Sequence, residues 1–236
     1  MTAVGTVDER ESGLRADLGA ASQVLAKVTL AGAVSGVVAV GVLARLAMSL
    51  LAHLNPHATG VTSDDGFTIG QFTFFGSLQL AASGLQFGII SAFFYLALRG
   101  LMVGPAWFRL LSISLGPAVV IGAIVVHTDG VDFRVLHPTW LAAALFVLVP
   151  AACCAVLHVL SERWLRSERD LARPLLVLGL LPWLPLLPLT LLLLAVYLVV
   201  RTFGRHQPAA WLLRASLAAL FVFAVVDLVK DIVELS

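Results

Sequence analysis

Long apolar runs separated by short polar stretches dominate the chain. Each run is close to the roughly 20 residues that a helix needs to cross the hydrocarbon core of a membrane. The pattern predicts six such spans, at 28–52, 72–98, 110–128, 139–160, 175–200 and 210–228. We therefore expect an all-α polytopic membrane protein, in which an N-terminal segment (1–27) precedes a single transmembrane domain (28–236).

Composition supports this assignment. The 236 residues are 60% hydrophobic and 12% charged, about half the charge of an ordinary soluble domain. The net charge is +1 and no Lys/Arg block is present, which argues against a nucleic-acid partner and leaves the lipid bilayer as the expected one. The sequence contains no nucleotide-binding glycine motif and no histidine pair at haem-ligand spacing inside a span.

The distribution of Lys and Arg predicts the orientation. With six spans, most of them fall on the side of the N-terminus, and only Arg134, Arg201 and Arg205 fall on the other. The positive-inside rule then places both termini in the cytoplasm of a plasma (inner) membrane. The loop between the first two spans should face outward.

This outward loop contains two adjacent carboxylates, Asp64 and Asp65, and the span before it contains Arg45. A charge at the depth of Arg45 is costly and usually finds a partner. One hypothesis is that Arg45 pairs with Asp64 or Asp65. The alternative is that the two carboxylates cap the next helix, since acidic residues suit a helix N-terminus, and that Asp65-Gly66 forms a turn.

A polar stripe runs along the second span. Gly76, Gln79, Ser83 and Gln86 recur at steps of three and four and therefore share one helix face. Because glutamine is disfavoured against lipid, we expect this face to look into the bundle. It would serve either interhelical hydrogen bonding or a polar path for a solute or proton. The pairs Gly32/Gly36 and Gly84/Gly88 have the spacing that lets helices approach closely.

Histidine and aspartate gather on the predicted outer side. Imidazole and carboxylate groups suit a divalent transition metal, although their spacing matches no strict motif. The same groups would suit pH sensing or plain loop polarity. The candidate metal-binding residues are His53, His57, His127, Asp129, Asp132 and His137.

Prolines interrupt the fifth span. Pro182, Pro185 and Pro188 each remove a helix hydrogen bond, so we expect a kinked or broken helix there. Transporters use broken helices as binding sites, and a kinked packing helix is the plainer interpretation.

The run "GVTSDDGFTIGQFTFFGSLQL" follows a glycine-rich span with an internal arginine. Over about residues 32–100 the chain resembles uncharacterised small multi-pass membrane proteins of actinobacteria, and the SDDGF stretch is the specific part. This resemblance implies a bacterial plasma-membrane protein. It implies no activity, substrate or catalytic residue.

Three function classes remain open at this point. The first is a non-enzymatic membrane protein that conducts or senses a small solute, ion or proton through a polar path. The second is an accessory or structural subunit that binds a membrane-protein partner or a second copy of itself. The third is a metal-dependent membrane enzyme that uses the outer His/Asp group. Arg45, the glutamines and the prolines together favour the first class.

Overall fold

The computed structural model describes residues 3–63, 66–126, 130–185, 191, 195, 198 and 207–235. Within these ranges the chain is helical and forms no named strand. Among the described residues, five helices are long and apolar enough to cross a membrane: Arg15–Leu54, Phe74–Arg99, Ala106–Val125, Thr139–Arg166 and Ala210–Glu234. The predicted all-α fold with helices of membrane-spanning length is therefore confirmed in its coarse form.

The first of these helices is one continuous rod. Helix α1 (Ala3–Gly36) passes through a π-helical segment η1 (Val37–Ala44) into α2 (Arg45–Leu54). It shows no break near residue 27, where the sequence analysis separated the N-terminal segment from the first span. Arg45 therefore lies at the start of the last part of this rod.

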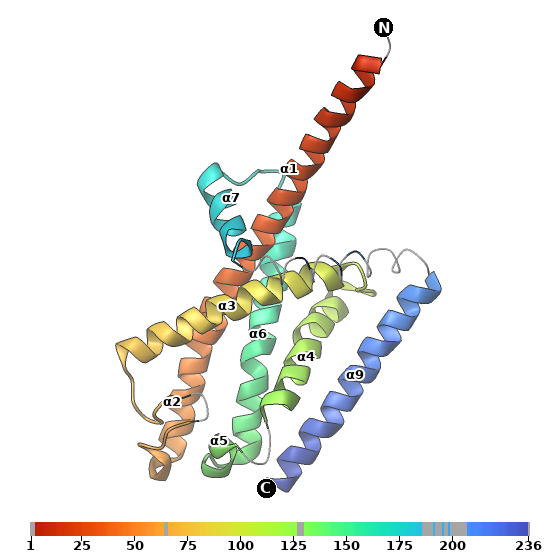
Figure 1. Cartoon of the computed structure of the whole chain (residues 1–236). Helices are drawn as coiled ribbons and strands as arrows, with labels where there is room; N and C mark the ends of the chain where they lie inside the picture. The colour runs from red at the N-terminus through yellow and green to blue at the C-terminus, as the bar shows by residue number, and fades with distance from the viewer. Residues whose placement is uncertain are drawn as a thin grey trace.

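Glycine contacts hold α1 against α3 (Phe74–Arg99). Gly32 and Gly36 lie against Gly84 and Gly88, and a Cβ added to Gly84 would lie 2.5 Å from the carbonyl oxygen of Gly36. The small-residue spacing thus correctly predicts close packing, because only glycine lets two backbones approach this near. In Figure 1, α3 crosses α1 at a steep angle.

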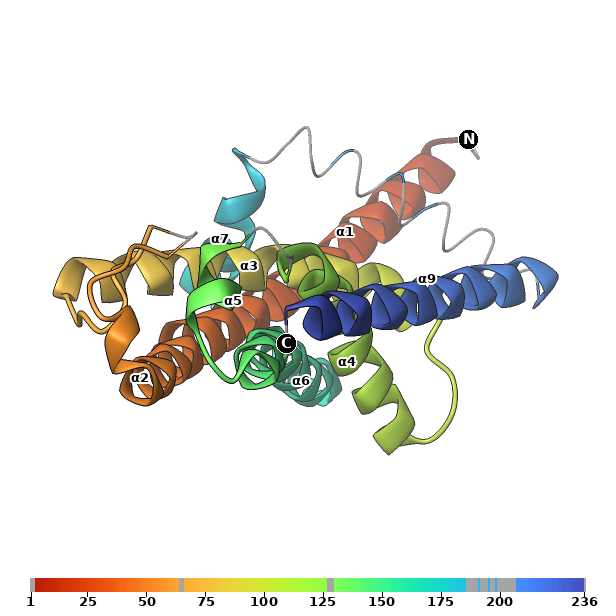
Figure 2. The same cartoon turned by 90° about the horizontal axis from the view of Figure 1, so that it is seen from below.

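Helix α6 (Thr139–Arg166) packs against both α1 and α4 (Ala106–Val125), and α9 (Gln207–Glu234) packs against α4. Gly122 of α4 lies against Val147 of α6. Seen from below, α6 lies beside α1, and α4 and α9 lie farther along the layer (Figure 2).

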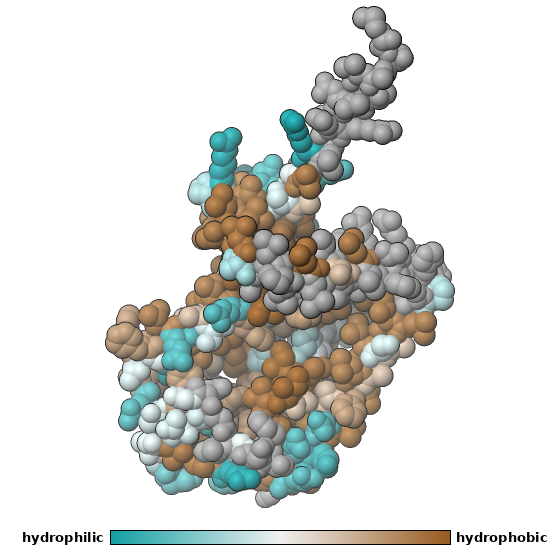
Figure 3. Space-filling view, in the orientation of Figure 1, coloured by the Kyte–Doolittle hydropathy of each residue, from teal (hydrophilic) through white to brown (hydrophobic). Residues whose placement is uncertain are grey.

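Two ends of this bundle can be distinguished. The N-terminal face is the end where α3 and α6 finish and α4 begins. The loop face is the opposite end, with residues 55–63 and 66–73, the short helix α5 (Val131–Val135) and the end of α9. Figure 3 shows hydrophobic surface across the middle of the molecule and hydrophilic residues gathered toward the loop face.

The loop face is tied together by one buried side chain. Asn55, 1% exposed, donates from Nδ2 to the carbonyl of His137 and accepts from the His137 N–H, at 2.9 and 2.8 Å. Apolar side chains of the same end form one cluster, which includes Leu51, Phe133 and Leu228. The cluster joins α2, α5 and α9.

The sixth span is not confirmed. Residues 173–183 form only the eight-residue helix α7 (Arg173–Leu180) and a 3-10 turn, η3 (Leu181–Trp183). This segment packs along α1 at the N-terminal face, where Trp183 donates from Nε1 to Thr29 Oγ1 at 2.9 Å. Most of the predicted span after residue 185 lies outside the described residues.

The predicted location of both termini on one side is not confirmed either. At the start of α9, Arg214 Nε donates to the Leu101 carbonyl at the N-terminal face. At its end, the Leu235 carbonyl accepts from Thr139 Oγ1 at the loop face. The ends of the chain therefore lie at opposite faces of the bundle (Figure 1).

Candidate functional site

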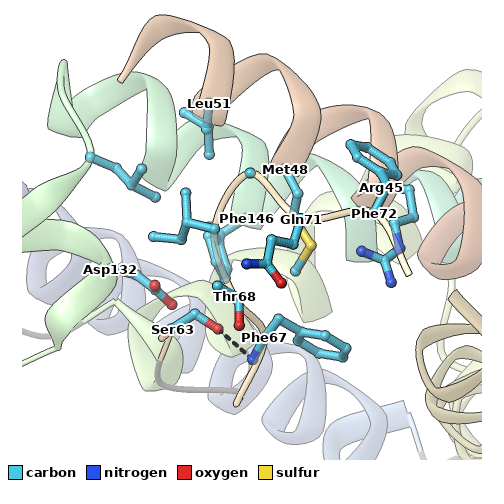
Figure 4. Close-up of a pocket in the computed structure, with 13 residues that line it drawn as sticks. Arg45, Met48, Leu51, Ser63, Phe67, Thr68, Gln71, Phe72, Asp132 and Phe146 are labelled. Carbon is cyan, nitrogen blue, oxygen red and sulfur yellow. Dashed lines mark hydrogen bonds between the residues drawn. The ribbon is translucent and has the colours of Figure 1, made fainter. Parts of the chain in front are cut away.

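A small pocket opens between α2, the loop that follows it, and the start of α6. It is lined by Arg45, Met48, Leu51, Ser63, Phe67, Thr68, Ile69, Gly70, Gln71, Phe72, Asp132, Leu136 and Phe146, and its volume is about 50 Å³. Figure 4 shows Arg45 and Asp132 at opposite ends of this pocket, with loop residues between them. A space of this size holds a few water molecules or a small ion.

The loop wall of the pocket is a compact turn. Ser63 and Phe67 are joined by a backbone hydrogen bond of 2.7 Å from the Ser63 N–H, and the Ser63 hydroxyl accepts from the Phe67 N–H at 3.1 Å. Gly66 and Gly70 have φ of +79° and +80°, a conformation that glycine adopts without strain. These contacts fix the loop so that Phe67 and Phe72 point toward α2.

Arg45 provides the positive charge of the pocket. Its guanidinium carbon lies 5.6 Å from the ring centroids of both Phe67 and Phe72, which is cation–π distance. Its Nε and Nη2 atoms are buried and have no hydrogen-bond partner among the described residues. A buried guanidinium without an acceptor is costly, so the site favours a group that supplies one.

The first turn of α3 strengthens the positive field. A Cβ added to Gly76 would lie 2.6 Å from Arg45 Nη2, so the guanidinium lies directly against this turn. Thr73 caps the helix, its hydroxyl accepting from the Gly76 N–H at 3.1 Å. The positive end of the helix dipole therefore adds to the charge of Arg45 and favours an anion.

Polar groups complete the pocket wall. Ser63, Thr68 and Gln71 bring hydroxyl and amide donors, and Asp132, 5% exposed, brings a carboxylate at the far end. The pocket is thus polarised, with its cation near α3 and its carboxylate near α5. Of the predicted metal-binding residues that the structure describes, Asp132 is the one that lines it.

The predicted partners of Arg45, Asp64 and Asp65, lie outside the described residues. The hypothesis of an Arg45–aspartate pair therefore stays a prediction. Ser63, which precedes this segment, and Phe67 line the same pocket as Arg45.

Gln79 and Gln86 do not line the pocket that contains Arg45. Both side chains are exposed on the outer surface of α3, and the expectation that they face the bundle interior is wrong for the single chain. The physical reason is a competition between two helix faces. Gly84 and Gly88, nearly opposite Gln86 on the helix, turn toward α1 because only they permit its close approach.

The structure does not gather the predicted metal-binding residues. Among the described residues, no three His, Cys, Asp or Glu side chains form a group able to hold a metal ion. His53, His57 and His137 are exposed, and His57 donates from Nε2 to the Val135 carbonyl at 3.1 Å. His127 and Asp129 lie outside the described residues.

The described prolines of the predicted fifth span lie just after the end of helix α7. The α-helical part of the segment ends at Leu180, Pro182 lies in the 3-10 turn η3, and Pro185 follows it in an exposed position. Pro188 lies outside the described residues. Trp183 at this point is buried against Phe93, with ring centroids 5.9 Å apart.

Sequence reasoning missed two parts of this region. The sequence pattern did not indicate Phe67 and Phe72 as partners of Arg45, because a cation–π contact requires no particular sequence spacing. Asn55 was missed as the residue that ties the loop face together, because its partner His137 is 82 positions away. Asn55 could have been noticed as a polar residue that directly follows an apolar helix.

The comparisons with protein-family models, with curated proteins and with solved structures gave no match. The fold and the site by themselves therefore define only a class: an all-α protein whose described residues include five helices of membrane-spanning length and an arginine pocket at the loop face.

Proposed function

We propose that the protein is a non-enzymatic integral membrane protein that senses a small anion at the Arg45 pocket. The observation that carries this proposal is the Arg45 guanidinium, whose buried Nε and Nη2 lack an acceptor among the described residues. The pocket volume of about 50 Å³ fits a small anion such as chloride or formate.

Sensing is favoured over conduction. Conduction needs a polar path through the bundle, and Gln79 and Gln86, the residues expected to form it, lie on the outer surface. The pocket lies instead between α2 and a loop held by its own hydrogen bonds. An anion bound between Arg45 and this loop would stabilise the loop against α2, which is a conformational signal.

The predicted Arg45–aspartate pair becomes the resting state of this sensor. If Asp64 or Asp65 neutralises Arg45 when the pocket is empty, a bound anion takes that place. Removing both carboxylates should then strengthen anion binding, because the competing charges are gone.

The experiment is a thermal-stability titration of the purified full chain in detergent with sodium formate and sodium chloride at constant ionic strength. We expect concentration-dependent stabilisation of the wild type that Arg45→Gln loses and Asp64→Asn/Asp65→Asn increases. Lys230→Gln is the matched control, since it removes an exposed charge at the same face. Equal stabilisation of Arg45→Gln and the wild type would overturn the proposal.

A second function, assembly with a membrane-spanning partner or a second copy of the chain, is favoured by a separate observation. Gln79, Ser83 and Gln86 are exposed along one side of α3, and Figure 3 shows hydrophilic patches over this helix. Lipid offers no hydrogen bonds to an amide, so a covering helix would supply them.

This second function is tested by subunit counting in lipid bilayers. Gln79→Leu/Gln86→Leu should reduce association with itself or with a co-extracted partner. Leu85→Ala, which changes the same exposed surface without changing a polar group, should leave association intact. Single, partner-free wild-type chains would contradict it.

We also propose that the N-terminal face is cytoplasmic in a bacterial plasma membrane. Basic residues concentrate there: Arg15, Lys27, Arg99, Arg109, Arg163, Arg166, Arg169, Arg173 and Arg214. By the positive-inside rule the loop face, the Arg45 pocket and the C-terminal end of α9 then face outward.

A further inference from the structure

A second group of cations lies at the N-terminal face, far from the Arg45 pocket, where α3 and α6 end and α4 begins. Glu162 of α6 is the carboxylate that these cations contact. Its Oε1 accepts from Tyr95 Oη at 2.9 Å and from Arg99 Nε at 2.8 Å, and its Oε2 lies 3.6 Å from Arg166 Nη2. Glu162 therefore already forms ion pairs with two arginines, Arg99 and Arg166.

Arg109 adds a third guanidinium from α4. Helices α4 and α6 are antiparallel, and Gly122 lies against Val147. Arg109, thirteen residues before Gly122, therefore lies level with residue 160 of α6. The charges of Glu162, Arg109, Arg99 and Arg166 all act on the His158 imidazole, which agrees with this placement. Three guanidinium groups and the Glu162 carboxylate thus act on this one imidazole, with a positive surplus.

Buried polar atoms without a partner gather at the same level. They are Arg109 Nε, His158 Nδ1 and Ser161 Oγ, and none has a hydrogen-bond partner among the described residues. Ser161 is 0% exposed, so water does not satisfy it from the surface. Guanidinium, imidazole and hydroxyl groups can all donate to one oxyanion. Arg99 and Arg166 keep 41% and 76% of their side-chain surface exposed, which leaves a way in from outside.

We infer that Arg99, Arg109, Arg166, His158 and Ser161 form a binding site for an anionic phosphate group. The position at the end of three helices is the level of phospholipid headgroups, and the neighbouring Trp107 is 64% exposed, as membrane-interface tryptophans are. The phosphate can belong to a phospholipid or be free in solution. This inference does not depend on the proposed anion sensing at the loop face.

The test measures thermal stability of the full chain in mixed micelles as phosphatidylglycerol replaces phosphatidylcholine, and separately with inorganic phosphate. We expect stabilisation by at least one probe. In Arg109→Gln the half-saturating concentration should rise roughly tenfold or more, the loss expected for one charge-assisted hydrogen bond. Stabilisation by the lipid alone identifies a headgroup site, and stabilisation by phosphate identifies a site for the free ion.

Two further variants keep the test decisive. Arg163→Gln removes an exposed charge from the same end of α6 and should bind like the wild type. Glu162→Gln should bind the probe more tightly despite lower basal stability, because the competing carboxylate is gone; a purely structural network predicts only the lower stability. If Arg109→Gln does not fold, Arg166→Gln replaces it. An equal loss in Arg163→Gln, or no stabilisation by either probe, would overturn the inference.

Discussion

Gly36 and Gly84 lie in backbone contact where α1 crosses α3, so this crossing has no room for a side chain. Gly84→Ala places a methyl group 2.5 Å from the Gly36 carbonyl oxygen and 2.9 Å from Val40. We expect it to lower stability by about 1–3 kcal/mol, the usual cost of overpacking. Gly19→Ala is the control, because nothing lies within 4 Å of its added Cβ. Thermal unfolding in detergent should show a fall for Gly84→Ala and no fall for Gly19→Ala.

The Asn55–His137 contact should be the main polar clamp of the loop face. Asn55→Ala removes two part-buried hydrogen bonds to the His137 N–H and carbonyl. We expect a loss of about 1–3 kcal/mol, the net contribution of two such hydrogen bonds. Hydrogen exchange of the amides at the start of α6 should increase as well. His57→Ala, which removes one exposed hydrogen bond from the same face, should have a smaller effect.

Trp183 should anchor α7 to α1 through one hydrogen bond and one ring contact. Trp183→Phe removes the bond to Thr29 while keeping an aromatic ring beside Phe93. We expect a loss of about 0.5–1.5 kcal/mol. Thr29→Val should cost a similar amount, and the double variant little more than either, because both remove the same bond. Fully additive losses would show that the two residues do not interact.

The direction of α9 predicts that the two termini can be labelled from opposite sides of the membrane. A single cysteine is added at either end in a Cys153→Ser/Cys154→Ser background. A membrane-impermeant thiol reagent should then reach the C-terminal cysteine in intact cells and the N-terminal one only after permeabilisation. Labelling of both ends from the same side would restore the six-span topology that hydropathy alone predicts.

The sequence predicted those features that depend on local composition. Apolar runs located the five spanning helices, and the Gly32/Gly36 and Gly84/Gly88 spacings indicated a close helix contact. Arg45 stood out because a charge inside a span is rare.

Other features could not be predicted from the sequence. Some depend on which of two helix faces packs inward, and others depend on contacts between residues that are far apart in the chain. Periodicity showed that Gln79 and Gln86 share a helix face. It could not show that the glycines on the opposite face pack against α1 and leave the glutamines exposed. Hydropathy could not show that the helix beginning at Arg173 ends at Leu180, because Pro182 in the following turn does not lower the apolar content of the segment. The contact of Arg45 with Phe67 and Phe72 exists only once the loop folds back.

The Arg45 pocket should bind a small anion, and a bromide bound there can be located by its anomalous scattering. Crystals of the full chain soaked in sodium bromide should show an anomalous peak within hydrogen-bond distance of Arg45 Nε and Nη2, and crystals of Arg45→Gln should not. Bromide peaks elsewhere on the molecule, with none beside Arg45 in the wild type, would contradict the claim.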